Sequence, residues 1–204
     1  MLAFAAFLIA LVSALYQLTT YLKGAKVQLF HPDRIMLEMR QNPGDTSVLG
    51  VVAPMSYVNT GGAGYNGVVR RELVRFQLDR QKYVYAWQEF VSSTSQGKQL
   101  ILTTQEEAHP FQVNGGSAKS HETRFTPDRP RCPNQDRQCL NSNFLTTDDF
   151  FEKAHQLDQM RFEFVADVFS KDRIRAACVV DLHPGFWDEL GEKGWATLPC
   201  WKSP

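Results

Sequence analysis

The chain opens with a long apolar segment and continues as short runs in which apolar and polar residues alternate. Residues 1–22 carry no charged side chain. About 20 apolar residues in a helix cross the hydrocarbon layer of a membrane, and a helix satisfies its own backbone polar groups there. The pattern therefore predicts a transmembrane anchor over 1–24, ahead of one domain over 25–204. The alternatives are a signal peptide cleaved at the small residues 12–14, and a buried helix of a soluble protein.

From residue 25 onward the pattern is typical of antiparallel strands that end at Gly, Pro, Asn and Asp residues. The expected strands are 35–40, 47–59, 74–79, 83–87, 99–104, 121–125, 161–169 and 174–182, of which the last two form a hairpin. Pro54 cannot donate a backbone hydrogen bond, so its strand is expected to lie at an edge or to contain a bulge. Short helices are expected at 147–154 and 184–190.

Short strands without strand–helix alternation favour two packed antiparallel sheets. The predicted fold is mainly β, with an N-terminal transmembrane helix followed by an immunoglobulin-like antiparallel β-sandwich that has one or two short helices. Residues 114–143 are polar and rich in Pro, Gly and Arg, which predicts a long surface loop.

Charge argues against nucleic-acid binding. The 204 residues include 22 Lys and Arg against 22 Asp and Glu, so no overall field attracts a phosphate backbone. The five histidines are scattered without H-E-x-x-H, and the spacing of Cys132 and Cys139 is too wide for a zinc knuckle. We therefore expect no metal and no cofactor.

Two features bear on the compartment and point in opposite directions. Four basic residues follow the apolar segment between 23 and 40 and none precedes it, so we predict that the domain lies on the cytoplasmic side of the cell membrane. The cysteines are Cys132, Cys139, Cys178 and Cys200, an even number that can form two disulfides in an oxidising compartment. Pairing of Cys132 with Cys139 and of Cys178 with Cys200 would place the domain in the periplasm, whereas all four are free thiols in a reducing compartment.

A glycine motif raises the question of a nucleotide site. Gly62, Gly64 and Gly67 match G-x-G-x-x-G, but that fingerprint needs a helix directly after it, and the residues that follow alternate like a strand. A flexible turn is therefore the favoured interpretation. A helix after Gly67 would support a cofactor site, whereas a strand paired to 47–59 would remove it.

The surface loop is the expected docking site for a partner. The residues expected to line this surface are Arg124, Phe125, Arg129, Arg131, Trp187 and Trp201. If the loop is peripheral, deletion of 117–138 should leave the stability of the domain nearly unchanged.

Part of the chain is similar to a known group of proteins. An apolar first segment, a short basic step and a strand precede Pro54–Gly61, and Gly67–Val69 then leads into an extended run. This order resembles uncharacterised bacterial proteins with a single membrane anchor and an immunoglobulin-like sandwich, in which an Asn-Thr-Gly turn ends an early strand. The resemblance covers residues 1 to about 80, and implies an anchor and a fold but no catalytic residues.

These features predict a membrane-anchored, non-enzymatic interaction module with a protein partner, such as a scaffold or an accessory subunit of a membrane complex. The alternative is an enzyme with a nucleotide-binding or hydrolytic site on the Gly62–Gly67 turn or the polar loop. The sequence has no G-x-S-x-G elbow, and no catalytic residue is assigned.

Overall fold

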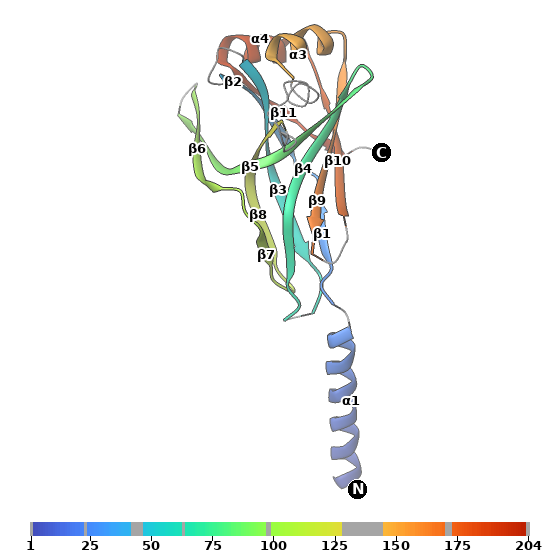
Figure 1. The fold of residues 1–204 in the computed structure, drawn as a ribbon. Coiled ribbons are helices and arrows are strands. Elements are labelled where there is room, and N and C mark those ends of the chain that lie inside the picture. The colour runs from blue at the N-terminus through green and yellow to red at the C-terminus, as the bar shows by residue number, and fades with distance from the viewer. Residues whose placement is uncertain are drawn as a thin grey trace, which may run out of the picture.

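The computed structural model describes residues 2–22, 24–41, 47–62, 64–96, 99–127, 145–169 and 173–202. Its helices are α1 (Leu2–Leu22), α3 (Thr147–Ala154) and α4 (Pro184–Lys193). Its strands are β1 (Val27–Phe30), β2 (Arg34–Gln41), β3 (Ser47–Asn59), β4 (Gly67–Leu78), β5 (Gln81–Gln96), β6 (Gln99–Glu107), β7 (Phe111–Val113), β8 (Ala118–Pro127), β9 (Gln159–Val168), β10 (Arg173–Asp181), β11 (Trp195–Pro199) and β12 (Trp201–Lys202). All of these strands belong to one antiparallel sheet (Figure 1).

The sheet is nearly closed by the segment that contains β11 and β12. The main path of the sheet runs β11-β2-β3-β8-β5-β4-β9-β10-β12. β11 pairs with β2 at one end of this path, and β12 pairs with β10 at the other. Cys200 is the single residue between them, and its disulfide to Cys178 of β10 brings the two Cα atoms to 5.4 Å. One short segment therefore joins the two ends of the sheet.

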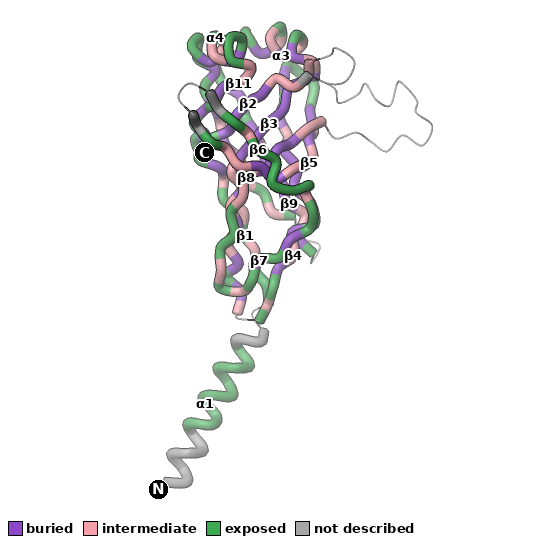
Figure 2. Tube along the Cα trace, turned by 90° about the vertical axis from the view of Figure 1, so that its left-hand side faces the viewer, coloured by how far each residue is buried: buried purple, intermediate pink, exposed green. Residues whose placement is uncertain are grey.

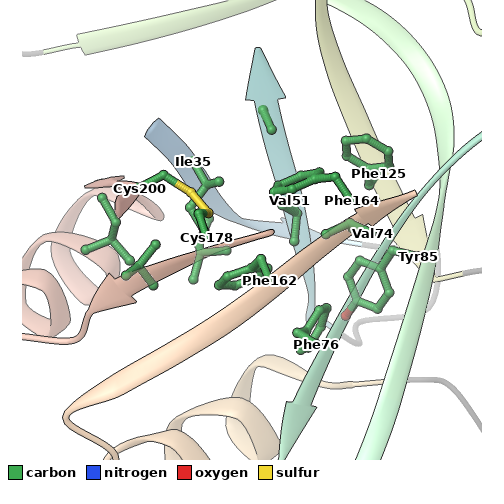
Figure 3. Close-up of a cluster of buried hydrophobic side chains, with 14 of the residues drawn as sticks. Ile35, Val51, Val74, Phe76, Tyr85, Phe125, Phe162, Phe164, Cys178 and Cys200 are labelled. Carbon is green, nitrogen blue, oxygen red and sulfur yellow. A yellow bond between two sulfur atoms is a disulfide. The ribbon is translucent and has the colours of Figure 1, made fainter. Parts of the chain in front are cut away.

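Alternation along the strands fills the enclosed space with large side chains. Phe76, Tyr85, Phe125, Phe162 and Phe164 point inward from four neighbouring strands and are buried (Figure 3). Aromatic rings bury large apolar areas, so they supply much of the hydrophobic stabilisation here. The purple, buried segments of the trace follow these strands (Figure 2).

Helices α3 and α4 cover the end of the sheet that lies away from α1 (Figure 1). α3 begins after Thr146, whose side chain accepts a hydrogen bond from the Asp149 backbone N–H. α4 begins after His183 and ends at Gly194, which has a positive φ of 76° that favours glycine. The buried residues of the two helices include Phe150, Phe186 and Leu190, which close the core at this end.

The predicted immunoglobulin-like sandwich is wrong, because the strands form one nearly closed sheet. β2 and β10, near the two ends of the strand path, are linked through β11 and β12. The long strand β5 pairs with β4, β6 and β8, with register shifts near Phe90 and Trp87 that accompany its change of partners. Alternating residues face inward in either architecture, so the sequence pattern alone does not separate the two.

The predicted transmembrane anchor over 1–24 is also wrong, and with it the single-pass membrane assignment. A helix does form at Leu2–Leu22, but no helix in the described part of the chain is both long and apolar enough to cross a membrane. Ser13, Gln17 and Thr19 place polar groups at short intervals along its second half. The helix extends away from the sheet (Figure 1).

Several strand and helix predictions agree closely with the structure. β3 spans Ser47–Asn59 as predicted, α3 spans Thr147–Ala154, and β9 pairs with β10 as a hairpin. The edge position inferred from Pro54 is wrong, because β3 lies inside the sheet. β2 pairs with β3 only up to Val52, and β1 starts pairing at Ser56. On this side of β3, Pro54 therefore has no partner, and its missing N–H interrupts neither of these two ladders; on the other side it lies opposite Glu122 of β8.

The predicted surface loop over 114–143 includes an internal strand. β8 lies between β3 and β5, and its residues Thr123, Arg124 and Phe125 are buried. Residues 128–144 lie outside the described residues. Deletion of 117–138 would remove a central strand, so the expectation that it leaves stability unchanged is wrong.

We expect the Cys178–Cys200 disulfide to stabilise the closed sheet. The bond closes a loop with a sequence separation of 22 residues, and cross-links of this kind contribute about 3 kcal/mol. A C178A/C200A variant should therefore lose about 3 kcal/mol of unfolding free energy in urea denaturation. An unchanged midpoint, with peptide mapping that shows the bond intact in the wild type, would contradict this expectation.

Candidate functional site

The interior of the sheet holds a polar interior cluster, formed by Glu72, Tyr57, His121 and Thr123. The Tyr57 hydroxyl donates to Glu72 Oε1 at 2.6 Å, and the Thr123 hydroxyl donates to Glu72 Oε2 at 2.7 Å. His121 Nε2 lies 2.9 Å from Glu72 Oε1. β4 supplies Glu72, β3 supplies Tyr57, and β8 supplies the other two side chains. Three strands are thereby joined through one carboxylate.

This cluster combines acid–base groups but is closed to a substrate. Glu72, Tyr57 and Thr123 are fully buried, and the His121 side chain is 12% exposed. Phe90 and Phe111 pack against the His121 ring, with centroid distances of 4.4 and 4.7 Å. Burial and the Glu72 carboxylate raise the pKa of Tyr57 well above its usual value, so this hydroxyl stays a neutral donor. The arrangement is that of a structural network.

Inward orientation of Glu72 follows from the alternation of β4, although the sequence analysis did not identify the cluster. Val74, Phe76 and Leu78 alternate on the inner face, and counting back by two reaches Glu72. An acidic residue on an apolar face is a signal for a buried hydrogen-bond network. Its partners come from distant strands, so their identity requires the sheet order.

A second polar cluster lies on the outer face of the sheet and is formed around Arg124. Arg124 Nε lies 2.8 Å from Glu38 Oε1, and its terminal nitrogen forms an ion pair with Glu89. Gly50 lies directly opposite Glu38 in the register, and a Cβ there would come within 2.9 Å of the Glu38 side chain. The glycine thus leaves room for Glu38 to lie across the sheet and reach Arg124.

The two carboxylates beside Arg124 have opposite pKa shifts. Burial raises the pKa of Glu38 and outweighs the opposing effect of Arg124 and Arg40. For Glu89, burial acts in the same direction, but hydrogen bonds from Thr104 and Arg124 outweigh it and lower the pKa. Arg124 therefore contacts two carboxylates, one with a raised pKa and one with a lowered pKa.

The glycine motif is not followed by the helix that a dinucleotide fingerprint needs. Gly67 begins strand β4, so the helix that the fingerprint needs is replaced by a strand. This strand pairs with β5, β7 and β9, which differs from the pairing to 47–59 that we expected of a strand here.

Asn59 holds this turn in place. Its side-chain oxygen accepts hydrogen bonds from the backbone N–H groups of Lys26 at 3.0 Å and Gly61 at 2.9 Å. Its amide nitrogen donates to the carbonyl oxygens of Tyr65 at 2.8 Å and Val113 at 3.0 Å. Asn59 is fully buried, and both the oxygen and the nitrogen of its side-chain amide form hydrogen bonds. The Asn of the Asn-Thr-Gly sequence therefore has a structural role.

A polar site is formed by a pair of adjoining hollows on the outer face, here named the cationic groove. The first hollow measures about 690 Å³ and is lined by Arg75, Phe76, Gln77, Lys82, Tyr83, Val84, Arg161, Glu163 and Arg175. The second measures about 400 Å³ and is lined by Leu29, Phe30, His31, Arg161, Arg175, Ala176, Ala177 and Lys202. Because Arg161 and Arg175 line both hollows, the two form one continuous site.

Positive charge dominates this groove. Its cations are Arg75, Lys82, Arg161, Arg175 and Lys202. Among the described lining residues, Glu163 supplies the carboxylate, 3.5 Å from Arg75 and 3.3 Å from Arg175. Alternation explains the arrangement, because odd-numbered residues of β9 and β10 face outward while their even-numbered neighbours face the core or are less exposed.

The residues expected to line a partner surface do not form one site. Arg124 is 8% exposed and Phe125 is fully buried, so neither belongs to an exposed surface and that assignment is wrong. Trp187 stacks on His155 with a centroid distance of 5.3 Å, within the aromatic cluster at α3 and α4. Trp201 of β12 is 59% exposed. Arg129, Arg131, Cys132 and Cys139 lie outside the described residues.

Comparisons with known proteins gave no match: no family model matches the chain, and no curated protein or solved structure is significantly similar to it. The function is therefore inferred from the geometry of the polar interior cluster and the cationic groove.

We expect the polar interior cluster to contribute strongly to stability. Replacing Glu72 by Ala leaves the buried donors of Tyr57 and Thr123 without an acceptor, which should cost about 3 kcal/mol of unfolding free energy. The milder Tyr57→Phe should cost about 1 kcal/mol. Urea denaturation measures both, and the exposed Glu106→Ala serves as the control, with a change below about 0.5 kcal/mol. Equal midpoints for Glu72→Ala and Glu106→Ala would contradict a structural role.

The opposite pKa shifts around Arg124 predict a pH dependence. The lowered pKa of Glu89 means that its charged form stabilises the fold above the ordinary value of 4.5, and that this contribution is lost as the pH falls through the folded pKa. The raised pKa of Glu38 means that its ionisation opposes folding above 4.5. At neutral pH, Glu89→Gln should therefore lower the free energy of unfolding more than Glu38→Gln does. Acidification should reduce the difference in unfolding free energy between Glu89→Gln and the wild type. Thermal melts across this pH range check the order, and the reverse order would refute it.

Proposed function

We propose that this protein is a non-enzymatic interaction module that binds an acidic protein partner through the cationic groove. The observation that carries the proposal is the contrast between its two polar sites. The acid–base groups of the polar interior cluster are buried behind aromatic rings, whereas the cations of the groove line open hollows. Binding at the outer face requires no access to the interior.

Charge complementarity supports an acidic partner. The chain has no net charge, so the five groove cations are a local concentration within a neutral molecule. Glu163 partly compensates Arg75 and Arg175. Lys82, Arg161 and Lys202 have no carboxylate partner among the described residues, so their charge is available to a ligand. Such a patch steers an acidic partner and sets its orientation.

An acidic polypeptide fits the groove better than a nucleic acid. Nucleic-acid recognition relies on a surplus of positive charge over an extended surface, and this chain has none overall. Glu163 also lies between Arg75 and Arg175, where it would repel a continuous line of phosphates. A peptide can place an uncharged residue opposite Glu163 and carboxylates opposite the arginines.

We also propose an oxidising compartment for this domain. The Cys178–Cys200 disulfide supports this placement, because such bonds persist outside reducing compartments. The basic residues between 23 and 40 favour the cytoplasm only in combination with a membrane-spanning segment, and the structure does not support that segment.

The test of the binding function uses a short fluorescein-labelled peptide rich in Glu and Ser. We expect it to bind the wild type with an affinity that falls as salt is added, because exposed charges are screened. R161Q/R175Q should weaken this binding about tenfold, since both arginines line both hollows. Fluorescence anisotropy measures the affinities.

A matched control removes the same charge elsewhere. R34Q/K193Q neutralises two cations that pair with Glu122 and Glu189, outside the groove. This variant should bind the peptide like the wild type. No binding by the wild type, or an equal loss in both double variants, would overturn the proposed function.

A further inference from the structure

We propose that the second hollow takes a bulky apolar side chain of the acidic partner, so that the recognised segment combines one such residue with flanking carboxylates. This inference rests on the proposed function and specifies the kind of segment that binds. It is carried by the lining of the second hollow, which differs in character from that of the first.

The second hollow has apolar walls and a floor of small residues. Leu29 and Phe30 come from β1, and Phe30 is 50% exposed. Ala176 and Ala177 come from β10, and Ala177 lies on the outward-facing side, where a side chain of one carbon leaves space above the strand. A volume of about 400 Å³ is within the range of pockets that hold small organic groups, and so it can accept one large side chain.

Cations surround this apolar space. Arg161 and Arg175 stand where the two hollows meet, and Lys202 stands on the β12 side. An apolar centre bordered by charged groups is the arrangement that concentrates binding energy at protein interfaces. Arg161 is exposed, and its planar guanidinium suits bidentate binding of a carboxylate next to the apolar side chain.

The closing disulfide fixes one wall of the hollow. Lys202 lies opposite Cys178 in the register between β12 and β10, and Ala176 and Ala177 directly precede Cys178. Because Cys178 is bonded to Cys200, the strand that carries Lys202 is held against β10. The hollow is therefore largely formed before a partner arrives, which lowers the ordering cost of binding.

A peptide satisfies both hollows better than an anionic lipid does. A lipid has one compact charged group, whereas the groove spreads its cations over two hollows with a combined lining that runs from Lys82 of β5 to Lys202 of β12. An extended peptide can cross these strands with several carboxylates. Its apolar side chain then enters the smaller hollow.

The experiment compares two labelled acidic peptides that differ at one position, Phe in one and Ser in the other. The wild type should bind the Phe peptide about tenfold more tightly, as expected from burial of one aromatic side chain. Ala177→Trp fills the hollow and should abolish this preference, so that the Phe and Ser peptides bind with equal affinity. Ala118→Trp, at an exposed alanine of β8, is the control and should keep the preference.

The outcomes separate this inference from the proposed function. Equal affinity of the wild type for both peptides would overturn the apolar subsite and leave the acidic-partner function standing. Binding of neither peptide would overturn the proposed function itself. Binding of anionic phospholipid vesicles, with neither peptide bound, would also overturn the inference and indicate a lipid ligand.

Discussion

The fold depends on the way one short segment joins the two ends of the sheet. β11 continues the sheet beside β2, β12 continues it beside β10, and Cys200 between them is bonded to Cys178. An open sheet of this length would leave two unpaired edges, and edges with free backbone groups invite association with other chains. The nearly closed sheet removes most of that exposure and encloses an aromatic core.

Closure also divides the molecule into two chemical surfaces. Polar groups on the inner face, such as Glu72, must find partners inside the protein, because water does not reach them. Tyr57 of β3 and Thr123 and His121 of β8 satisfy that requirement, although neither strand pairs with β4. The outer face has no such requirement, so a cation such as Arg161 of β9 remains available to a ligand. Stability and recognition thus use opposite faces of the same strands.

Sequence patterns located single elements well and their assembly poorly. Alternation and turn residues identified β3, α3 and the β9–β10 hairpin, because each depends on neighbouring residues in the chain. The closed sheet depends on pairings such as that of β2 with β11, which join distant segments and leave no local signal. For the same reason, the groove was not predicted: Arg75, Arg161 and Arg175 lie on three strands, and only the sheet order brings them together.

The late position of the closing segment has a consequence for folding. During synthesis β2 emerges long before β11, and residues 195–202, which complete the sheet, emerge after all the other strands. Pairings between distant segments are slow to form, and a strand that waits for its partner is exposed to competing association. The chain therefore passes through a stage in which the free edges of β2 and β10 are vulnerable to aggregation, and chaperones or rapid oxidation of Cys178 with Cys200 would shorten that stage.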